Sequence, residues 1–152
     1  MAITVTVAVE KGGVGKTTTC VNLAAAMAAA GKKVLAVDMD TQANCTYFLT
    51  GNKKRTEAYK NRGVAEMLRA YGLVEPGAFI HPTQIPGVDI IPSNAASVTL
   101  PETLNTLAQN YADSKNRFLA YCLAKVSEGY DYVLIDTPPN LEVMTASALL
   151  AA

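Results

Sequence analysis

The chain has 152 residues, of which 50% are hydrophobic and 17% are charged, and its formal net charge is zero. This length and composition fit one globular domain over residues 1–152 and exclude a disordered chain. The absence of a net positive charge argues against a global attraction to nucleic acid or to an anionic membrane surface.

The first predicted unit is a strand, a helix and a second strand. Residues 3–9 are almost continuously apolar and rich in β-branched side chains, which predicts a parallel strand buried on both faces. A glycine-rich stretch separates this strand from an alanine-rich helix at 17–30 that ends at Gly31. Residues 34–37 predict a second buried strand. Together these segments predict a right-handed crossover with the glycine-rich stretch at its first turn.

The rest of the chain continues the alternation of helices and strands. Residues 51–62 are polar and basic, which indicates a solvated loop, with a nucleic-acid or partner contact as the alternative, and residues 75–87 also indicate a loop. Helical spacing and short apolar runs predict, in order, a helix at 64–71, a strand at 88–91, helices around 104–111 and 118–126, a strand at 132–135 and a helix from about 142. This order predicts an α/β fold with a mostly parallel sheet flanked by helices on both faces.

The glycine-rich stretch carries the most specific chemistry of the chain. Residues 9–19 read VEKGGVGKTTT, between the first strand and the first helix. Glycine tolerates positive φ and has no Cβ, so the loop can turn its N–H groups towards an anion, and the helix dipole favours the same anion. We therefore expect a nucleotide polyphosphate to bind residues Lys11, Gly12, Gly13, Val14, Gly15, Lys16, Thr17 and Thr18. Lys16 would reach the β- and γ-phosphates, and the hydroxyl of Thr17 would bind Mg²⁺. The alternative is a glycine-rich turn that binds nothing.

Aspartates follow two further predicted strands, at the sheet edge where open α/β folds bind their ligands. Asp136 ends an apolar strand, as the carboxylate near Mg²⁺ does in phosphate-loop hydrolases, and would hold the metal through water. Asp38 and Asp40 are two residues apart, so on an extended chain they face the same way. We predict Asp38 on the metal side and Asp40 beside the water that attacks the γ-phosphate. For each aspartate alone, the alternative is a helix N-cap or a solvated turn.

Cysteine usage and hydropathy indicate a cytoplasmic protein. Cys20, Cys45 and Cys122 are widely spaced and form no C-x-x-C pair, which is typical of reduced thiols that act as small apolar residues. The chain does not begin with basic residues followed by an apolar stretch, so we expect no signal peptide. The longest apolar helical segment, near residues 20–30, is shorter than the ~20 residues needed to cross a bilayer, and we expect no membrane partner.

Four motifs resemble one family. The sequence KGGVGKTT at 11–18 resembles the deviant Walker A loop of the ParA/MinD superfamily of P-loop ATPases, and DMDTQAN at 38–44 resembles its second motif. The sequences IPSN at 91–94 and YDYVLIDTPP at 130–139 resemble the ParA/Soj branch in particular. The resemblance extends to Ala152 and implies a P-loop NTPase-like fold.

This resemblance implies an ATP-driven switch for plasmid or chromosome partitioning. It implies ATP or ADP and Mg²⁺ as ligands, catalytic roles for Lys11, Lys16 and Asp40, and a homodimer that ATP closes face to face. The family lysine that matches Lys11 crosses to the partner's phosphates, where such a cation is worth on the order of 10³–10⁵ in rate. The resemblance also implies a ParB-like adaptor that stimulates hydrolysis, non-specific DNA binding and, for a full-length protein, association with the nucleoid.

The chain departs from the family pattern at three positions. Glu10 stands where the family has Gly or Gln, and a carboxylate facing phosphates would repel them. We therefore expect its side chain to point away from the phosphates or to meet a lysine. Thr41 replaces a proline and Ala43 replaces a glycine of the family pattern. These replacements affect the expected backbone geometry of the second motif, but not the expected roles of Asp38 and Asp40.

Family members are longer than this chain, so the resemblance predicts the N-terminal part of a longer domain, with a fold that is incomplete at the C-terminus. We expect the DNA-binding surface in the missing part, and we expect the chain alone to bind nucleotide weakly and to hydrolyse little ATP. A MinD-like membrane-cycling ATPase, a metal-cluster carrier and a catalytically inert nucleotide-binding fragment are the alternatives. The carrier needs paired cysteines near the fourth strand, and residues 136–152 contain none.

Overall fold

A computed structural model describes residues 1–9, 11, 13, 15–54, 56–139 and 142–152. In this part of the chain, strands form one five-stranded sheet in the order β1-β5-β2-β4-β3. The parallel strands are β1 (Ile3–Val7), β5 (Tyr132–Asp136), β2 (Val34–Asp38) and β4 (Val88–Ile91), and β3 (His81–Pro82) pairs antiparallel with β4. The predicted α/β class with a mostly parallel sheet is confirmed.

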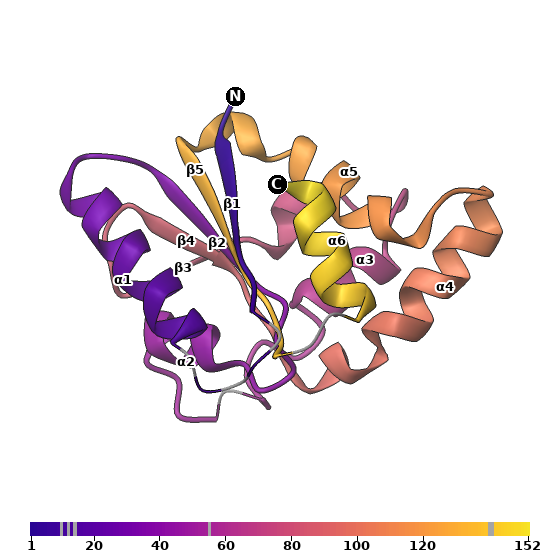
Figure 1. The fold of residues 1–152 in the computed structure, drawn as a ribbon, viewed down its shortest axis with the longest axis horizontal. Coiled ribbons are helices and arrows are strands. Elements are labelled where there is room, and N and C mark those ends of the chain that lie inside the picture. The colour runs from indigo at the N-terminus through magenta and orange to yellow at the C-terminus, as the bar shows by residue number, and fades with distance from the viewer. Residues whose placement is uncertain (10, 12, 14, 55, 140–141) are drawn as a thin grey trace.

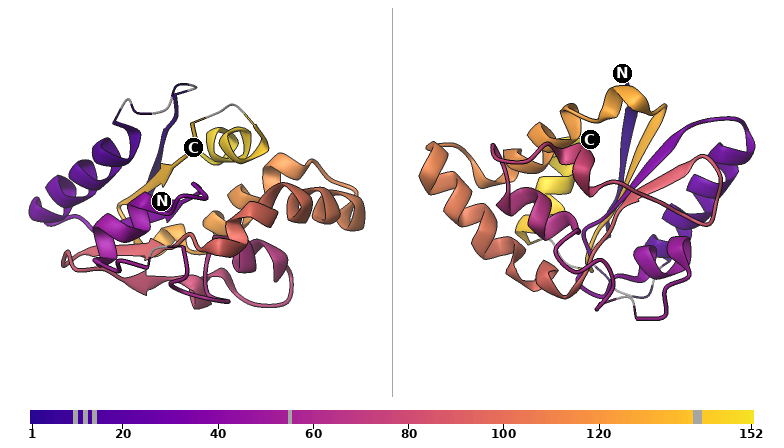
Figure 2. Two further views of the ribbon diagram at one scale, coloured as in Figure 1. Left: turned by 90° about the horizontal axis from the view of Figure 1, so that it is seen from below. Right: turned by 180° about the vertical axis from the view of Figure 1, so that it is seen from behind.

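Helices cover both faces of this sheet (Figures 1 and 2). One face carries α1 (Lys16–Ala29) and α2 (Asn44–Thr50). The other carries α3 (Val64–Arg69), α4 (Leu100–Tyr111), α5 (Phe118–Ala124) and α6 (Val143–Ala151). Short 3₁₀ turns lie at Pro76–Phe79 (η1), Ala95–Thr99 (η2), Lys115–Arg117 (η3) and Ser127–Gly129 (η4). The predicted arrangement of helices on both faces is confirmed.

The central strand β2 shows how the sequence produces two cores. Its residues alternate between the faces, because side chains along a strand point to opposite sides. Leu35 and Val37 join the core under α3, α4, α5 and α6, whereas Val34 and Ala36 join the core under α1 and α2. All five residues of β2 are buried, which explains why this strand reads as a continuous apolar run.

The first strand lies at the edge of the sheet, which corrects the prediction that residues 3–9 are buried on both faces. Strand β1 ends at Val7, and among the described residues it pairs only with β5. Ile3 is 59% exposed, and the remaining residues of β1 are half-buried. A run of β-branched residues indicates a strand, but its neighbours in the sheet decide how deeply it is buried.

The structure also contains elements that the sequence did not predict. Helix α2 begins at Asn44, the last residue of the motif at 38–44. It lies between Ala43 and Gly51, which both have positive φ. The predicted loop at 75–87 includes η1 and the short strand β3. The helix predicted over 118–126 ends at Ala124. These elements are too short to produce a clear period in the sequence.

Cys20, Cys45 and Cys122 are buried free thiols, as the sequence predicts. Within the described ranges, no helix has the length and apolarity needed to cross a bilayer.

Candidate functional site

A cavity of about 450 Å³ lies where β1, β2 and β5 end. Its lining combines the glycine-rich loop, the start of α1, the segment after β2 and the segment after β5: Gly13, Gly15, Lys16, Thr17, Thr18, Asp40, Gln42, Asn44, Phe48 and Pro139. The structure therefore brings Asp40 beside five residues of the predicted phosphate loop. Gly12, Val14 and the family departure Glu10 lie outside the described residues.

The two described glycines of the loop have left-handed backbone conformations. Gly13 has φ 72° and Gly15, the N-cap of α1, has φ 87°. A Cβ at either position would meet no atom of the described residues within 4 Å, chain neighbours apart, so the backbone angle is what favours glycine here. A glycine N-cap supplies no side-chain acceptor to the first amides of α1. Those amides are the groups that bind anions at helix N-termini.

Lys16 places a cation at the start of α1. Its side chain is nearly buried, with 8% exposure, and its Nζ donates a hydrogen bond to the carbonyl of Lys11 at 3.2 Å. The side chain of Lys11 is exposed. The loop therefore holds one lysine inside the cavity and a second on the surface.

Asp136 and Thr17 bring two oxygen-bearing side chains together. The hydroxyl of Thr17 donates to Oδ2 of Asp136 at 2.7 Å. Oδ1 of Asp136 is buried and accepts no hydrogen bond from any described residue. Burial raises the pKa of Asp136 to about 6; Asp40 also raises it, whereas the Thr17 hydroxyl and Lys16 oppose the rise. A carboxylate oxygen without a partner beside a hydroxyl fits a hard cation such as Mg²⁺.

Asp38 differs from Asp136 because protein groups occupy both of its oxygens. Its Oδ1 accepts from the amide of Asp40 at 3.1 Å, and its Oδ2 accepts from the amide and hydroxyl of Thr46 at 2.9 and 2.7 Å. Burial, followed by the nearby charge of Asp136, raises the pKa of Asp38 to about 7, although these hydrogen bonds lower it. Asp38 is wholly buried, and of the two aspartates it is Asp40 that lines the cavity. That the two side chains face the same way stays a prediction. The metal-side role of Asp38 stays a prediction, and its bonds fix the position of Asp40.

Oxygen atoms of Asp40 accept three hydrogen bonds. Its Oδ1 accepts from the amide of Gln42 at 2.9 Å, and its carbonyl accepts from the amide of Ala43 at 3.0 Å and from the hydroxyl of Ser93 at 2.7 Å. Only 7% of its surface is exposed. This geometry fixes the Asp40 backbone next to the cavity.

The structure contains a buried polar network next to Asp40 that was not predicted from the sequence. The amide of Ser93 donates to the hydroxyl of Thr46 at 2.9 Å, and the hydroxyls of Ser93 and Ser97 lie 2.7 Å apart. The network therefore connects the end of β4 to Asp38 and Asp40. The signal for Ser93 is its place directly after an apolar strand, within the motif at 91–94, whereas Thr46 lies on the unpredicted helix α2.

Phe48 lines the cavity, and the sequence contains no signal for this position. It lies on α2, is 56% exposed and contributes an aromatic side chain to the wall of the cavity. Because the sequence did not predict α2, it also did not place Phe48 beside the phosphate loop.

Comparison with known proteins identifies relatives over the whole chain. A family model described as an AAA domain matches residues 2–152. The chromosome-partitioning ATPase Soj of Thermus thermophilus is 38% identical over 147 residues, which cover 94% of this chain and 49% of Soj. The chain thus spans about half the length of the curated relatives that it matches.

Solved structures share the fold. The cobyrinic acid a,c-diamide synthase of Mycobacterium smegmatis, solved with ADP and magnesium, superimposes with a TM-score of 0.85 at 34% identity over 100% of this chain and 57% of the synthase. A plasmid partition protein from Borrelia burgdorferi B31, described as putative and bound to AMPPNP, gives a TM-score of 0.78 at 30% identity over 99% of this chain and 60% of its own.

Proposed function

Because the chain belongs to the AAA domain family, whose model matches residues 2–152, we propose that it binds ATP or ADP with Mg²⁺ and hydrolyses ATP as a switch in plasmid or chromosome partitioning. The similarity to Soj and to the AMPPNP-bound partition protein supports this assignment. The observation that carries it is the single cavity that contains the glycine loop, the cation of Lys16 and the Thr17 side chain bonded to Asp136.

The phosphates of the nucleotide would be bound by the loop and the first turn of α1. The amides of Gly13 and Gly15 would donate to phosphate oxygens, and Lys16 would exchange its bond to the Lys11 carbonyl for a bond to phosphate. Thr17 and Asp136 would hold Mg²⁺, and the unpartnered Oδ1 of Asp136 favours such a role. When bound, the metal neutralises phosphate charge.

Asp40 orients the attacking water in this proposal. Its position in the cavity wall supports the role, because a water-positioning acceptor must be fixed near the phosphates. The bonds from Gln42 and Ser93 provide that fixation.

Lys11 acts on the nucleotide of a second copy. Its exposed side chain supports this role, because a residue that acts in trans has to be accessible to the partner. A homodimer closed by ATP, a ParB-like adaptor, non-specific DNA binding and a cytoplasmic, nucleoid-associated location complete the proposal. A catalytically inert fragment is the alternative that the experiment has to distinguish.

The proposal is tested by ATP hydrolysis with Mg²⁺ at high protein concentration, comparing the wild type with Lys16→Ala, Lys11→Ala and Asp40→Ala. We expect a low wild-type rate that rises more steeply than linearly with protein concentration, and no turnover in any variant. An equal mixture of Lys11→Ala and Asp40→Ala should recover about a quarter of the wild-type rate, because half of the dimers then contain one complete site of two. A rate that Lys16→Ala leaves unchanged would contradict the proposed site, and a mixture without recovery would contradict action in trans.

A further inference from the structure

A second cavity, of about 430 Å³, shares no described lining residue with the candidate nucleotide site. Its walls come from the segment before α3, from α3 itself and from the start of η2, and they include Glu57, Lys60, Asn61, Glu66, Asn94 and Ala95. None of these residues has a role in the function proposed above. The size lies within the range of small-molecule pockets.

Glu66 lines this cavity and has one buried carboxylate oxygen without a partner among the described residues. The residue is on α3 and only 9% exposed. Its Oε1 accepts a hydrogen bond from Nδ2 of Asn94 at 2.6 Å. Its Oε2 is buried and receives no hydrogen bond within the described part of the chain.

Asn94 cannot donate a hydrogen bond to Oε2 of Glu66 as well. Its Nδ2 also donates to the carbonyl of Tyr59 at 2.8 Å, so both amide hydrogens are used. Its Oδ1 accepts from the amide of Ala96 at 2.9 Å. Asn94 therefore fixes the Glu66 carboxyl group in one orientation and leaves Oε2 for a donor from outside the described residues.

We propose that this cavity binds a cationic N–H donor, an ammonium or guanidinium group, which donates to Oε2 of Glu66. Buried polar groups in proteins are almost always paired, and charge-assisted bonds to carboxylates are the stronger ones. The described ionisable lining comprises Glu57, Glu66 and Lys60, two acids and one base, so its net charge of −1 favours a cation. The cationic group comes either from a free small molecule or from the side chain of an arginine or lysine in a peptide.

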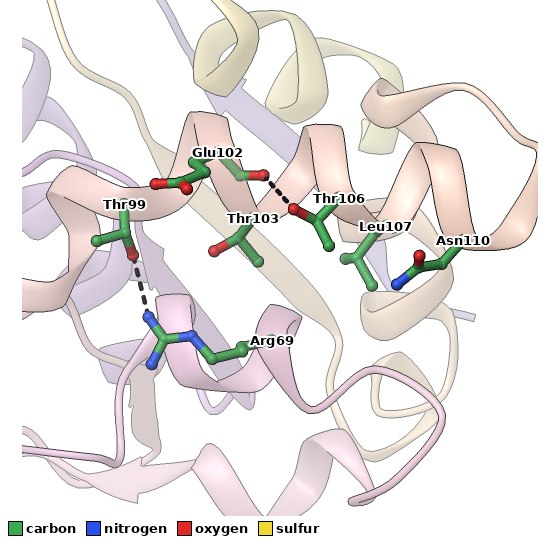
Figure 3. A pocket seen from close by; sticks show the side chains of 7 residues that line it. All are labelled: Arg69, Thr99, Glu102, Thr103, Thr106, Leu107 and Asn110. Atoms are coloured by element: carbon green, nitrogen blue, oxygen red, sulfur yellow. Dashed lines mark hydrogen bonds between the residues drawn. The ribbon is translucent and has the colours of Figure 1, made fainter.

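A third cavity serves as a comparison, because its described lining lacks the unpartnered buried oxygen found at the Glu66 cavity. It lies between α3 and α4 and is lined by Leu107 and by polar side chains (Figure 3). There the guanidinium of Arg69 already donates to the hydroxyl of Thr99 at 3.1 Å. Among its described lining residues, none has a buried side-chain polar atom without a partner. That cavity carries no comparable indication of a ligand.

The test is an amide ¹H–¹⁵N NMR titration of the chain with methylguanidinium chloride, with neutral N-methylurea as the matched probe. Methylguanidinium should shift the signals of Glu66, Asn94 and Ala95 saturably, and N-methylurea should bind at least tenfold more weakly. Glu66→Gln keeps the size of the side chain and removes its charge, and we expect affinity to fall about 10- to 100-fold. Ala95→Leu, which fills the cavity from an exposed position, should also prevent binding and keeps Glu66. Glu102→Gln, in the third cavity, should leave binding unchanged.

Two further arms identify the source of the cation. Agmatine represents a free small molecule, and the capped peptide Gly-Arg-Gly represents a protein side chain. Either compound binding more tightly than methylguanidinium supports the proposal and names the source. Shifts that are equal for the two matched probes, or that persist unchanged in both Glu66→Gln and Ala95→Leu, would overturn it. The spectra of the variants show directly whether each is folded.

Discussion

The two buried aspartates of the candidate site predict an unusual dependence of stability on pH in the absence of ligand. The pKa values of Asp136 and Asp38 rise from 3.8 to about 6 and about 7, mainly because of burial. The folded protein therefore binds more protons than the unfolded protein between about pH 4 and pH 7. The contribution of these groups to stability is fully present below pH 3.8 and is lost as the pH rises through the folded-state values.

Asp136→Asn isolates the contribution of Asp136 to this effect. A pKa rise from 3.8 to about 6 corresponds to on the order of 3 kcal/mol of unfolding free energy at high pH. Asparagine resembles the protonated carboxyl group in shape and charge. The variant should therefore match the wild type near pH 4 and exceed its stability by ~3 kcal/mol at pH 8.

The assay is urea unfolding of both proteins from pH 4 to pH 8 without nucleotide or Mg²⁺. Asp113→Asn provides a control of opposite sign, because the hydroxyl of Tyr121, followed by the amide of Ser114, lowers the pKa of partly exposed Asp113. That variant should lose stability most at high pH. A difference between Asp136→Asn and the wild type that does not change with pH would refute the reasoning. Mg²⁺ with ADP should stabilise the wild type more at pH 8 than at pH 5, because the ligand binds ionised Asp136.

Two substitutions test the packing around Asp40 and Asn94. Ser93→Ala removes the hydrogen bond to the Asp40 carbonyl, and we expect a loss of about 1–2 kcal/mol in urea unfolding and slower ATP turnover with ADP affinity retained. Thr106→Ala on the exposed face of α4 is its control, and equal effects of the two on turnover would contradict the positioning role. Gly63→Ala would place a Cβ 2.7 Å from Nδ2 of Asn94 and 2.9 Å from the carbonyl of Pro92, and should cost about 1–3 kcal/mol in thermal or urea unfolding. Gly129→Ala meets no atom within 4 Å and should cost less than about 0.5 kcal/mol, so similar losses at both glycines would refute the steric argument.

The sequence predicted the phosphate-loop side of the site because that chemistry is local. Glycines, a lysine and threonines between a strand and a helix favour one backbone conformation and predict one kind of ligand within ten or so residues. Asp136 was predictable for a related reason, since an acidic residue directly after a buried strand lies at the binding edge of a parallel sheet.

The remaining features depend on tertiary contacts that no local pattern records. Asp40 lines the cavity and Asp38 does not, because the Asp38 carboxylate accepts hydrogen bonds inside the protein from the amide of Asp40 and from Thr46. Helix α2 has only seven residues, so the roles of Thr46 and Phe48 could not be predicted. The edge position of β1 follows from the strand order, which β-branched composition does not encode.

Calorimetric titration of the chain with ADP in the presence of Mg²⁺ tests the central claim most directly. We expect one weak site per chain that is lost when EDTA removes Mg²⁺ and is absent in Lys16→Ala, whereas Lys11→Ala retains it. Binding of equal strength in the wild type and Lys16→Ala, or no binding by the folded wild-type chain, would contradict the assignment of this cavity to a nucleotide.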